Sequence, residues 1–131
     1  MSITQREILR DYFDSIAPSR RRWKKRNRAY HRLVEKYYRF LVPENSRVIE
    51  IGCGTADLLD ALRPSEGTGV DFSPKMLEIA ADVHPQYDYH LQEAESLRLD
   101  DKFEYVIMSD LVGCLWDVQK AFGALRSITH E

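Results

Sequence analysis

The stretch EIGCGTAD, from Glu50 to Asp57, constrains the fold of this chain more than any other part of its sequence. It overlaps a short apolar run with Val48, Ile49 and Ile51, as expected for a buried strand of a parallel sheet. Two glycines follow, spaced two apart, and leave the backbone without Cβ atoms just before an expected helix. A strand, a glycine-rich turn and a helix in this order are typical of α/β proteins that bind a ligand at the carboxyl ends of parallel strands.

Strand and helix patterns alternate along the rest of the chain. Apolar residues at helical spacing predict a first helix that ends at Pro18 and a second from about Arg28 to Leu41, ahead of Pro43. Further on, we expect strands near residues 47–51, 67–72, 87–91 and 105–108, and helices near residues 58–62, 74–81 and 117–128. This alternation predicts an α/β fold with a mostly parallel sheet and helices on both of its faces.

The charges divide the chain into two parts. Its 131 residues are enough for one domain with a hydrophobic core but not for two. Residues 1–45 carry twelve Lys and Arg against five Asp and Glu, whereas residues 46–131 carry seven against sixteen. We therefore predict a basic N-terminal helical segment, residues 1–45, followed by an α/β ligand-binding domain, residues 46–131.

The basic excess is concentrated in SRRRWKKRNRAYHR, Ser19 to Arg32, where Trp23 and Tyr30 interleave with the charges. Aromatic residues among cations are found on some nucleic-acid-binding surfaces, so residues Arg20–Arg32 suggest a nucleic acid as one candidate partner. A solvated helix face, or a segment lying across the acidic C-terminal part, explains the pattern as well. We rank that explanation first because the net charge of the whole chain is −2.

Several classes of protein are disfavoured by the sequence. It has no N-terminal apolar signal segment and no run of about eighteen apolar residues, so we expect no membrane span and a cytoplasmic location. The two cysteines, Cys53 and Cys114, form no close pair, so we predict no disulfide framework. The histidines show no catalytic-triad or metal-ligand spacing, and we assign no chemistry and no metal to them; they are His31, His84, His90 and His130.

The glycine-rich stretch also limits the kind of ligand. Gly52 and Gly54 let a ligand approach the backbone, and Glu50 supplies an acceptor at the end of the strand. The spacing is G-x-G-x-A, and Asp57 stands where a dinucleotide site favours a small residue, so its charge would repel a pyrophosphate. A nicotinamide cofactor is therefore disfavoured. A ligand with an ammonium group and ribose hydroxyls fits better, because carboxylates accept hydrogen bonds from both.

VIEIGCGTADLL resembles the first motif of class I S-adenosylmethionine-dependent methyltransferases. The resemblance implies that Glu50, Gly52, Cys53 and Gly54 surround the methionine part of the cofactor. The third glycine of the family's motif is Ala56 here, which is acceptable unless that position needs positive φ.

Two further stretches are similar to later motifs of the same family. In GVDFSPKMLEIA, the resemblance implies that Asp71 binds both ribose hydroxyls, while Phe72 and Met76 flank the adenine. In QEAESL, Glu93 and Ala94 match the position that recognises the adenine amino group. These motifs occur in the family's order and at its spacing.

FEYVIMSDLV is similar to the family's fourth-strand motif. By this resemblance, Ser109 and Asp110 enter the methyl-transfer region. Asp110 is the one candidate for a general base, needed only where the acceptor must lose a proton.

The resemblance implies a Rossmann-like three-layer sandwich whose readable strands have the order 3-2-1-4. The family's C-terminal strands are not found in this chain, so we expect the fourth strand to be an unpaired edge that favours self-association. The implied activity is methyl transfer from S-adenosylmethionine, with S-adenosylhomocysteine as product. The acceptor is unidentified and a small molecule is favoured. The alternative is a non-catalytic module that binds RNA or another anion through its basic segment.

Overall fold

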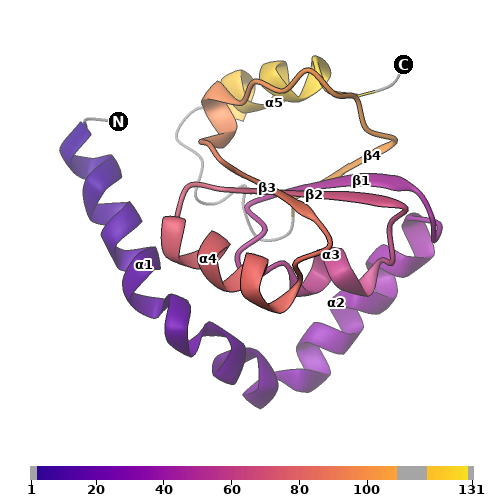
Figure 1. Ribbon diagram of the computed structural model, residues 1–131, viewed down its shortest axis with the longest axis horizontal. Coiled ribbons are helices and arrows are strands. Elements are labelled where there is room, and N and C mark those ends of the chain that lie inside the picture. The colour runs from indigo at the N-terminus through magenta and orange to yellow at the C-terminus, as the bar shows by residue number, and fades with distance from the viewer. Residues whose placement is uncertain (1–2, 109–117, 130–131) are drawn as a thin grey trace.

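Four parallel strands form a single sheet at the centre of the protein. The computed structural model describes residues 3–108 and 118–129 (Figure 1). The strand order is β3-β2-β1-β4, and every neighbouring pair is parallel. The strands are β1 (Arg47–Ile51), β2 (Glu66–Asp71), β3 (Asp88–Leu91) and β4 (Tyr105–Ile107). The predicted α/β fold with order 3-2-1-4 is confirmed.

Helices cover both faces of this sheet, so the molecule has three layers (Figure 1). One face carries α1 (Ile3–Arg26), α2 (Arg28–Leu41), α3 (Asp57–Ala61) and α4 (Pro74–Val83). The other carries α5 (Val118–Arg126), which packs near the 3-10 helix η1 (Ala94–Ser96). Two N-terminal helices therefore precede the sheet, as predicted.

Side chains of β1 alternate between two apolar cores. Ile49 and Ile51 join the core that includes Phe103, Leu125 and Ile128 beneath α5. Val48 points to the opposite face and packs with Leu59 and residues of α3 and α4. Because side chains of a strand alternate with period two, Glu50 shares the face of Val48. An acidic side chain is thus placed in a buried layer between the sheet and the helices.

The first helix is longer than predicted, because α1 continues through Pro18 to Arg26. Proline removes one backbone hydrogen bond from a helix and usually ends or kinks it. Here both halves of α1 are held by the domain. Asp14 binds the start of α4, and Lys24 binds Asp57 at the start of α3. These contacts keep the helix continuous, and the sequence pattern around Pro18 did not reveal them.

An apolar face of α2 remains exposed. None of the described side chains of α2 is fully buried, and Leu33, Tyr37, Phe40 and Leu41 are 54% to 86% exposed. Within the described part of the chain, β4 pairs only with β1. The predicted edge strand is therefore confirmed. No helix in that part has the length and apolar character to cross a membrane.

Candidate functional site

The loop after β1 is held in an unusual backbone conformation. Gly52 has φ 74°, Gly54 has φ 55° and Ala56 has φ 64°. The N–H groups of Gly52 and Cys53 both donate to the carbonyl oxygen of Val70, at 2.7 and 3.0 Å. The position of the third glycine therefore does need positive φ, and a fully buried alanine occupies it. The left-handed region costs an L-residue about 1–2 kcal/mol.

Asp71 fixes this loop from the end of β2. Its Oδ2 accepts a hydrogen bond from the N–H of Gly54, and its Oδ1 accepts one from the N–H of Ser73, both at 2.9 Å. Burial raises the pKa of Asp71, and the backbone N–H donors oppose this rise only in part. Each carboxylate oxygen can accept a second hydrogen bond. Asp71 can therefore hold the loop and still bind a ligand hydroxyl.

Glu50 lies at the base of the site and is 3% exposed. Burial raises its pKa to about 8, and the nearby ammonium group of Lys24 opposes the rise. Its Oε1 is buried and has no hydrogen-bond partner among residues 3–108 and 118–129. Buried polar atoms are nearly always paired, so a carboxylate oxygen of this kind is suited to accept a hydrogen bond from a ligand.

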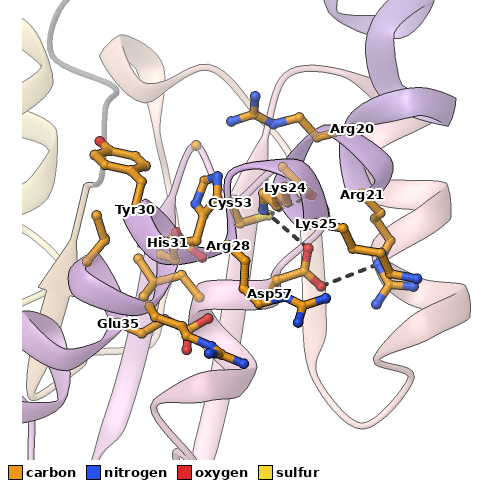
Figure 2. A pocket seen from close by; sticks show the side chains of 16 residues that line it. Arg20, Arg21, Lys24, Lys25, Arg28, Tyr30, His31, Glu35, Cys53 and Asp57 are labelled. Atoms are coloured by element: carbon orange, nitrogen blue, oxygen red, sulfur yellow. Dashed lines mark hydrogen bonds and ion pairs between the residues drawn. The ribbon is translucent and has the colours of Figure 1, made fainter.

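A cavity of about 410 Å³ opens above Glu50, between the glycine loop and the corner where α1 meets α2. Figure 2 shows side chains of both helices around it. The loop contributes Gly52, Cys53 and Gly54 to its wall. The helices contribute six cations, namely Arg20, Arg21, Lys24, Lys25, Arg28 and Arg32. The basic segment thus lies over the glycine loop, in line with the suggestion that it lies across the acidic part of the chain.

Asp57 anchors this basic segment to the start of α3. Lys24 lies 3.2 Å from its Oδ2, and Arg21 lies 3.6 Å from its Oδ1. His84 is 3.0 Å from Oδ1, and Thr55 donates to Oδ2 at 2.6 Å. Burial alone would raise the pKa of Asp57, but these partners outweigh it and lower the pKa. The residue is therefore a stable anion at one side of the cavity.

The residues expected around the adenine lie beneath the first half of α1. The Phe72 ring meets Phe13 edge-on, with centroids 5.4 Å apart. Glu93 forms ion pairs with Arg6 at 3.4 Å and Arg10 at 3.9 Å. These contacts place α1 along the carboxyl ends of β2 and β3.

Met76 and Ala94 are more deeply placed than their neighbours. Met76 is buried at the start of α4, where its N–H donates to Ser73 Oγ in the predicted helix cap. Its sulfur lies 3.9 Å from the position that a Cβ at Gly54 would take. Ala94 is buried in the core beneath α5. The structure thus brings Met76 against the glycine loop, whereas Ala94 lies in the core between the sheet and α5.

Two predicted site residues, Ser109 and Asp110, lie outside the described residues. In contrast, His31 and Tyr30 line the cavity although the sequence analysis gave His31 no role. No sequence signal suggested it, because the apolar side of the predicted helix, with Leu33 and Tyr37, is exposed in the structure. Among residues 3–108 and 118–129, no cluster of three or more His, Cys, Asp or Glu could hold a metal ion.

Comparison with known proteins shows the family. Residues 22–131 match the family model described as a methyltransferase domain. The chain belongs to this methyltransferase family. Two similar proteins are named demethylmenaquinone methyltransferase, from Chlorobaculum parvum and Chlorobaculum tepidum. Each is 26% identical over an alignment of 115 positions that covers 78% of this chain and 46% of the relative. The chain therefore spans about half the length of the curated relatives it matches.

Solved structures share the methyltransferase fold. A putative methyltransferase from Haloferax volcanii, in complex with the Trm112 methyltransferase activator, superposes with a TM-score of 0.74 and 22% identity, over 89% of this chain and 55% of that one. Magnesium protoporphyrin IX methyltransferase from Synechocystis, with bound SAM, superposes with a TM-score of 0.73 and 21% identity. The superposition covers 94% of this chain and 71% of that one. The fold is that of class I methyltransferases, as the sequence motifs predicted.

Proposed function

We propose that this methyltransferase domain binds S-adenosylmethionine in the cavity above Glu50 and transfers its methyl group to an acceptor, leaving S-adenosylhomocysteine. The observation that supports this most is the unpartnered Oε1 of Glu50 beside a glycine loop held at positive φ. A ligand ammonium group would satisfy that oxygen, and bare backbone lets the ligand lie close. The residues present fit the cofactor.

The remaining residues have complementary roles in this proposal. Glu50 binds the ammonium group of the methionine part, and a cation at the corner of α1 and α2 binds its carboxylate. Asp71 accepts hydrogen bonds from the ribose hydroxyls, Phe72 and Met76 flank the adenine, and Glu93 with Ala94 recognises its amino group. Gly52, Cys53 and Gly54 form the wall, while Ser109 and Asp110 extend toward the acceptor.

When bound, the sulfonium of the cofactor supplies an activated methyl group. The chain's own contribution is to align the acceptor with that group and to exclude water. Proximity and orientation of this kind are worth roughly 7–11 kcal/mol in favourable systems. We further propose a small molecule as acceptor, because two similar proteins are named for a small-molecule acceptor. The names of two relatives specify one such acceptor, demethylmenaquinone.

One observation supports the alternative, a non-catalytic module that binds RNA or another anion. In the described part of the chain, no carboxylate pairs with Lys25, Arg28 or Arg32. Anion binding by these cations would weaken steeply with salt and would not depend on Asp71. Because the same cations line the cavity above the glycine loop, we place this function second.

We also propose how the chain is organised. Residues 1–45 form a basic segment that covers the site, and residues 46–131 form the cofactor-binding domain of a cytoplasmic protein. The exposed edge of β4, together with the apolar face of α2, is proposed as a surface for self-association.

Calorimetric titration of the 131-residue protein with S-adenosylmethionine and S-adenosylhomocysteine tests the main proposal. We expect micromolar binding that Asp71→Ala abolishes and Asp88→Ala retains, because Asp88 lies exposed at the outer edge of the sheet. Binding of neither compound by the folded wild-type protein would reject a cofactor site in this chain.

A further inference from the structure

His31 is placed where the cofactor cavity meets the α1–α2 corner. It lies on the inward side of α2 and lines the cavity together with Gly52 and Cys53 of the glycine loop. Figure 2 shows His31, Tyr30 and Cys53 among the side chains that line the cavity. An imidazole is therefore present within the same enclosed space as the proposed methionine subsite.

Aromatic contacts and the helix corner hold this imidazole in place. Trp23 of α1 meets the His31 ring edge-on with centroids 5.4 Å apart, and Tyr30 does so at 5.2 Å. The corner itself is fixed by Asn27, whose side-chain amide donates to the carbonyl of Trp23 at 2.9 Å. The N–H of His31 donates to the carbonyl of Asn27 at 3.2 Å. The position of the ring is therefore set before any ligand binds.

The other ionisable groups in the cavity are less suited to accept a proton. Asp57 is paired with Lys24, Arg21 and His84. Glu35 lies 4.0 Å from the guanidinium of Arg39. Burial raises the pKa of the Cys53 thiol well above its usual range, so it stays protonated. Glu50 is buried at the base, where the proposed ammonium group occupies it. An imidazole, by contrast, changes charge near neutral pH.

We propose that His31 is a general base for the methyl transfer, acting on an acceptor that carries an O–H or N–H group. As the acceptor's lone pair forms its bond to the methyl carbon, the carbon–sulfur bond breaks and its electron pair stays on sulfur. The proton that the acceptor loses passes to the imidazole of His31, which becomes an imidazolium and later releases the proton to water. This assignment rests on the proposed cofactor site and adds the residue that accepts the proton.

Nuclear magnetic resonance can test the placement without a known acceptor. The ¹³Cε1 signals of the histidines are titrated with pH in the complexes with S-adenosylmethionine and S-adenosylhomocysteine, and His31→Gln and His90→Gln provide assignments. The two ligands differ by the charge of the sulfonium. A positive charge brought into a partly solvated cavity lowers the pKa of an imidazole on its wall, by up to roughly one unit. We expect that difference at His31 and none at His90, which lies on β3.

The charged and ionisable groups around His31 are common to both complexes, so they cancel in the comparison. They are Arg20, Arg21, Lys24 and Lys25 from α1, Arg28, Tyr30, Arg32 and Glu35 from α2, and Glu50, Cys53 and Asp57 from the domain. Binding of both ligands with the same His31 pKa would overturn this role and leave the cofactor site intact. Binding of neither ligand would instead reject the proposed function itself, and the role of His31 with it.

Discussion

The carboxylate of Asp71 and the N–H of Gly54, 2.9 Å apart, join the end of β2 to the glycine loop that follows β1. Replacement by alanine leaves the N–H groups of Gly54 and Ser73 without their acceptor, and a lost buried hydrogen bond costs about 1–3 kcal/mol. We expect Asp71→Ala to lower the free energy of unfolding by about 2 kcal/mol in urea titrations. Asp71→Asn keeps one acceptor oxygen and should lose about half as much. Equal losses in the two variants would contradict this explanation.

The backbone at Ala56 predicts a stabilising substitution. Its φ of 64° is unfavourable for alanine but not for glycine, although glycine loses more chain entropy on folding. We expect Ala56→Gly to raise the free energy of unfolding by about 0.5–1 kcal/mol. Ala29→Gly, at an exposed position within α2, is the matched control and should lower it by about 1 kcal/mol. A loss of stability in both variants would show that Ala56 is not strained.

The sequence predicted the fold well because its signals are local. Ser73 followed by a proline marked the start of α4, and the structure shows the capping hydrogen bond from Met76 to Ser73. The apolar runs of the strands and the acid at the end of β2 likewise depend on nearby residues only. These patterns were sufficient for the strand order once the family's motifs were recognised.

Long-range contacts account for what the sequence did not reveal. Pro18 marks a helix end by local rules, but contacts of Asp14 and Lys24 with the domain keep α1 intact. The position of His31 depends on how α2 turns back over the glycine loop, and that turn leaves no spacing pattern. The motif raised the question of positive φ at Ala56, but the sequence could not answer it, because alanine is normally found in other regions.

Contacts of Asp14 predict how firmly α1 covers the site. Its Oδ1 accepts hydrogen bonds from Ser73 Oγ at 2.5 Å and from the N–H of Lys75 at 3.2 Å, at the positive end of α4. Asp14→Ala removes both, so we expect α1 amides to exchange with solvent several-fold faster while β1 amides keep their relative protection. Asp11→Ala, on the exposed side of α1, is the control. Similar exchange in both variants would show that Asp14 does not hold the helix.

The exposed apolar face of α2 predicts concentration-dependent association. Phe40 is 86% exposed and Tyr37 is 65% exposed. We expect sedimentation analysis to show a dimer at high protein concentration, and Phe40→Glu to shift the protein toward monomer. Leu91→Glu, at the opposite edge of the sheet, should leave the association unchanged. If Leu91→Glu instead disrupts the dimer, β3 rather than the α2 and β4 side forms the contact.

The pKa of Glu50 predicts an unusual dependence of stability on pH. An acid whose pKa rises from its unfolded value of 4.5 to about 8 binds its proton more tightly in the folded protein. Its contribution is therefore fully present below pH 4.5 and is lost as pH rises toward 8, by about 1.4 kcal/mol per pH unit at most. Glu50→Gln has no group that titrates here, so its free energy of unfolding does not fall in this way. The variant should therefore become more stable relative to wild type as pH rises from 4.5 to about 8. Denaturant unfolding at several pH values measures the difference, and parallel profiles would show that Glu50 is ionised in the folded protein.

Cofactor affinity should change in the opposite direction, since an ionised Glu50 binds the ammonium group better and wild-type binding should tighten as pH approaches 8.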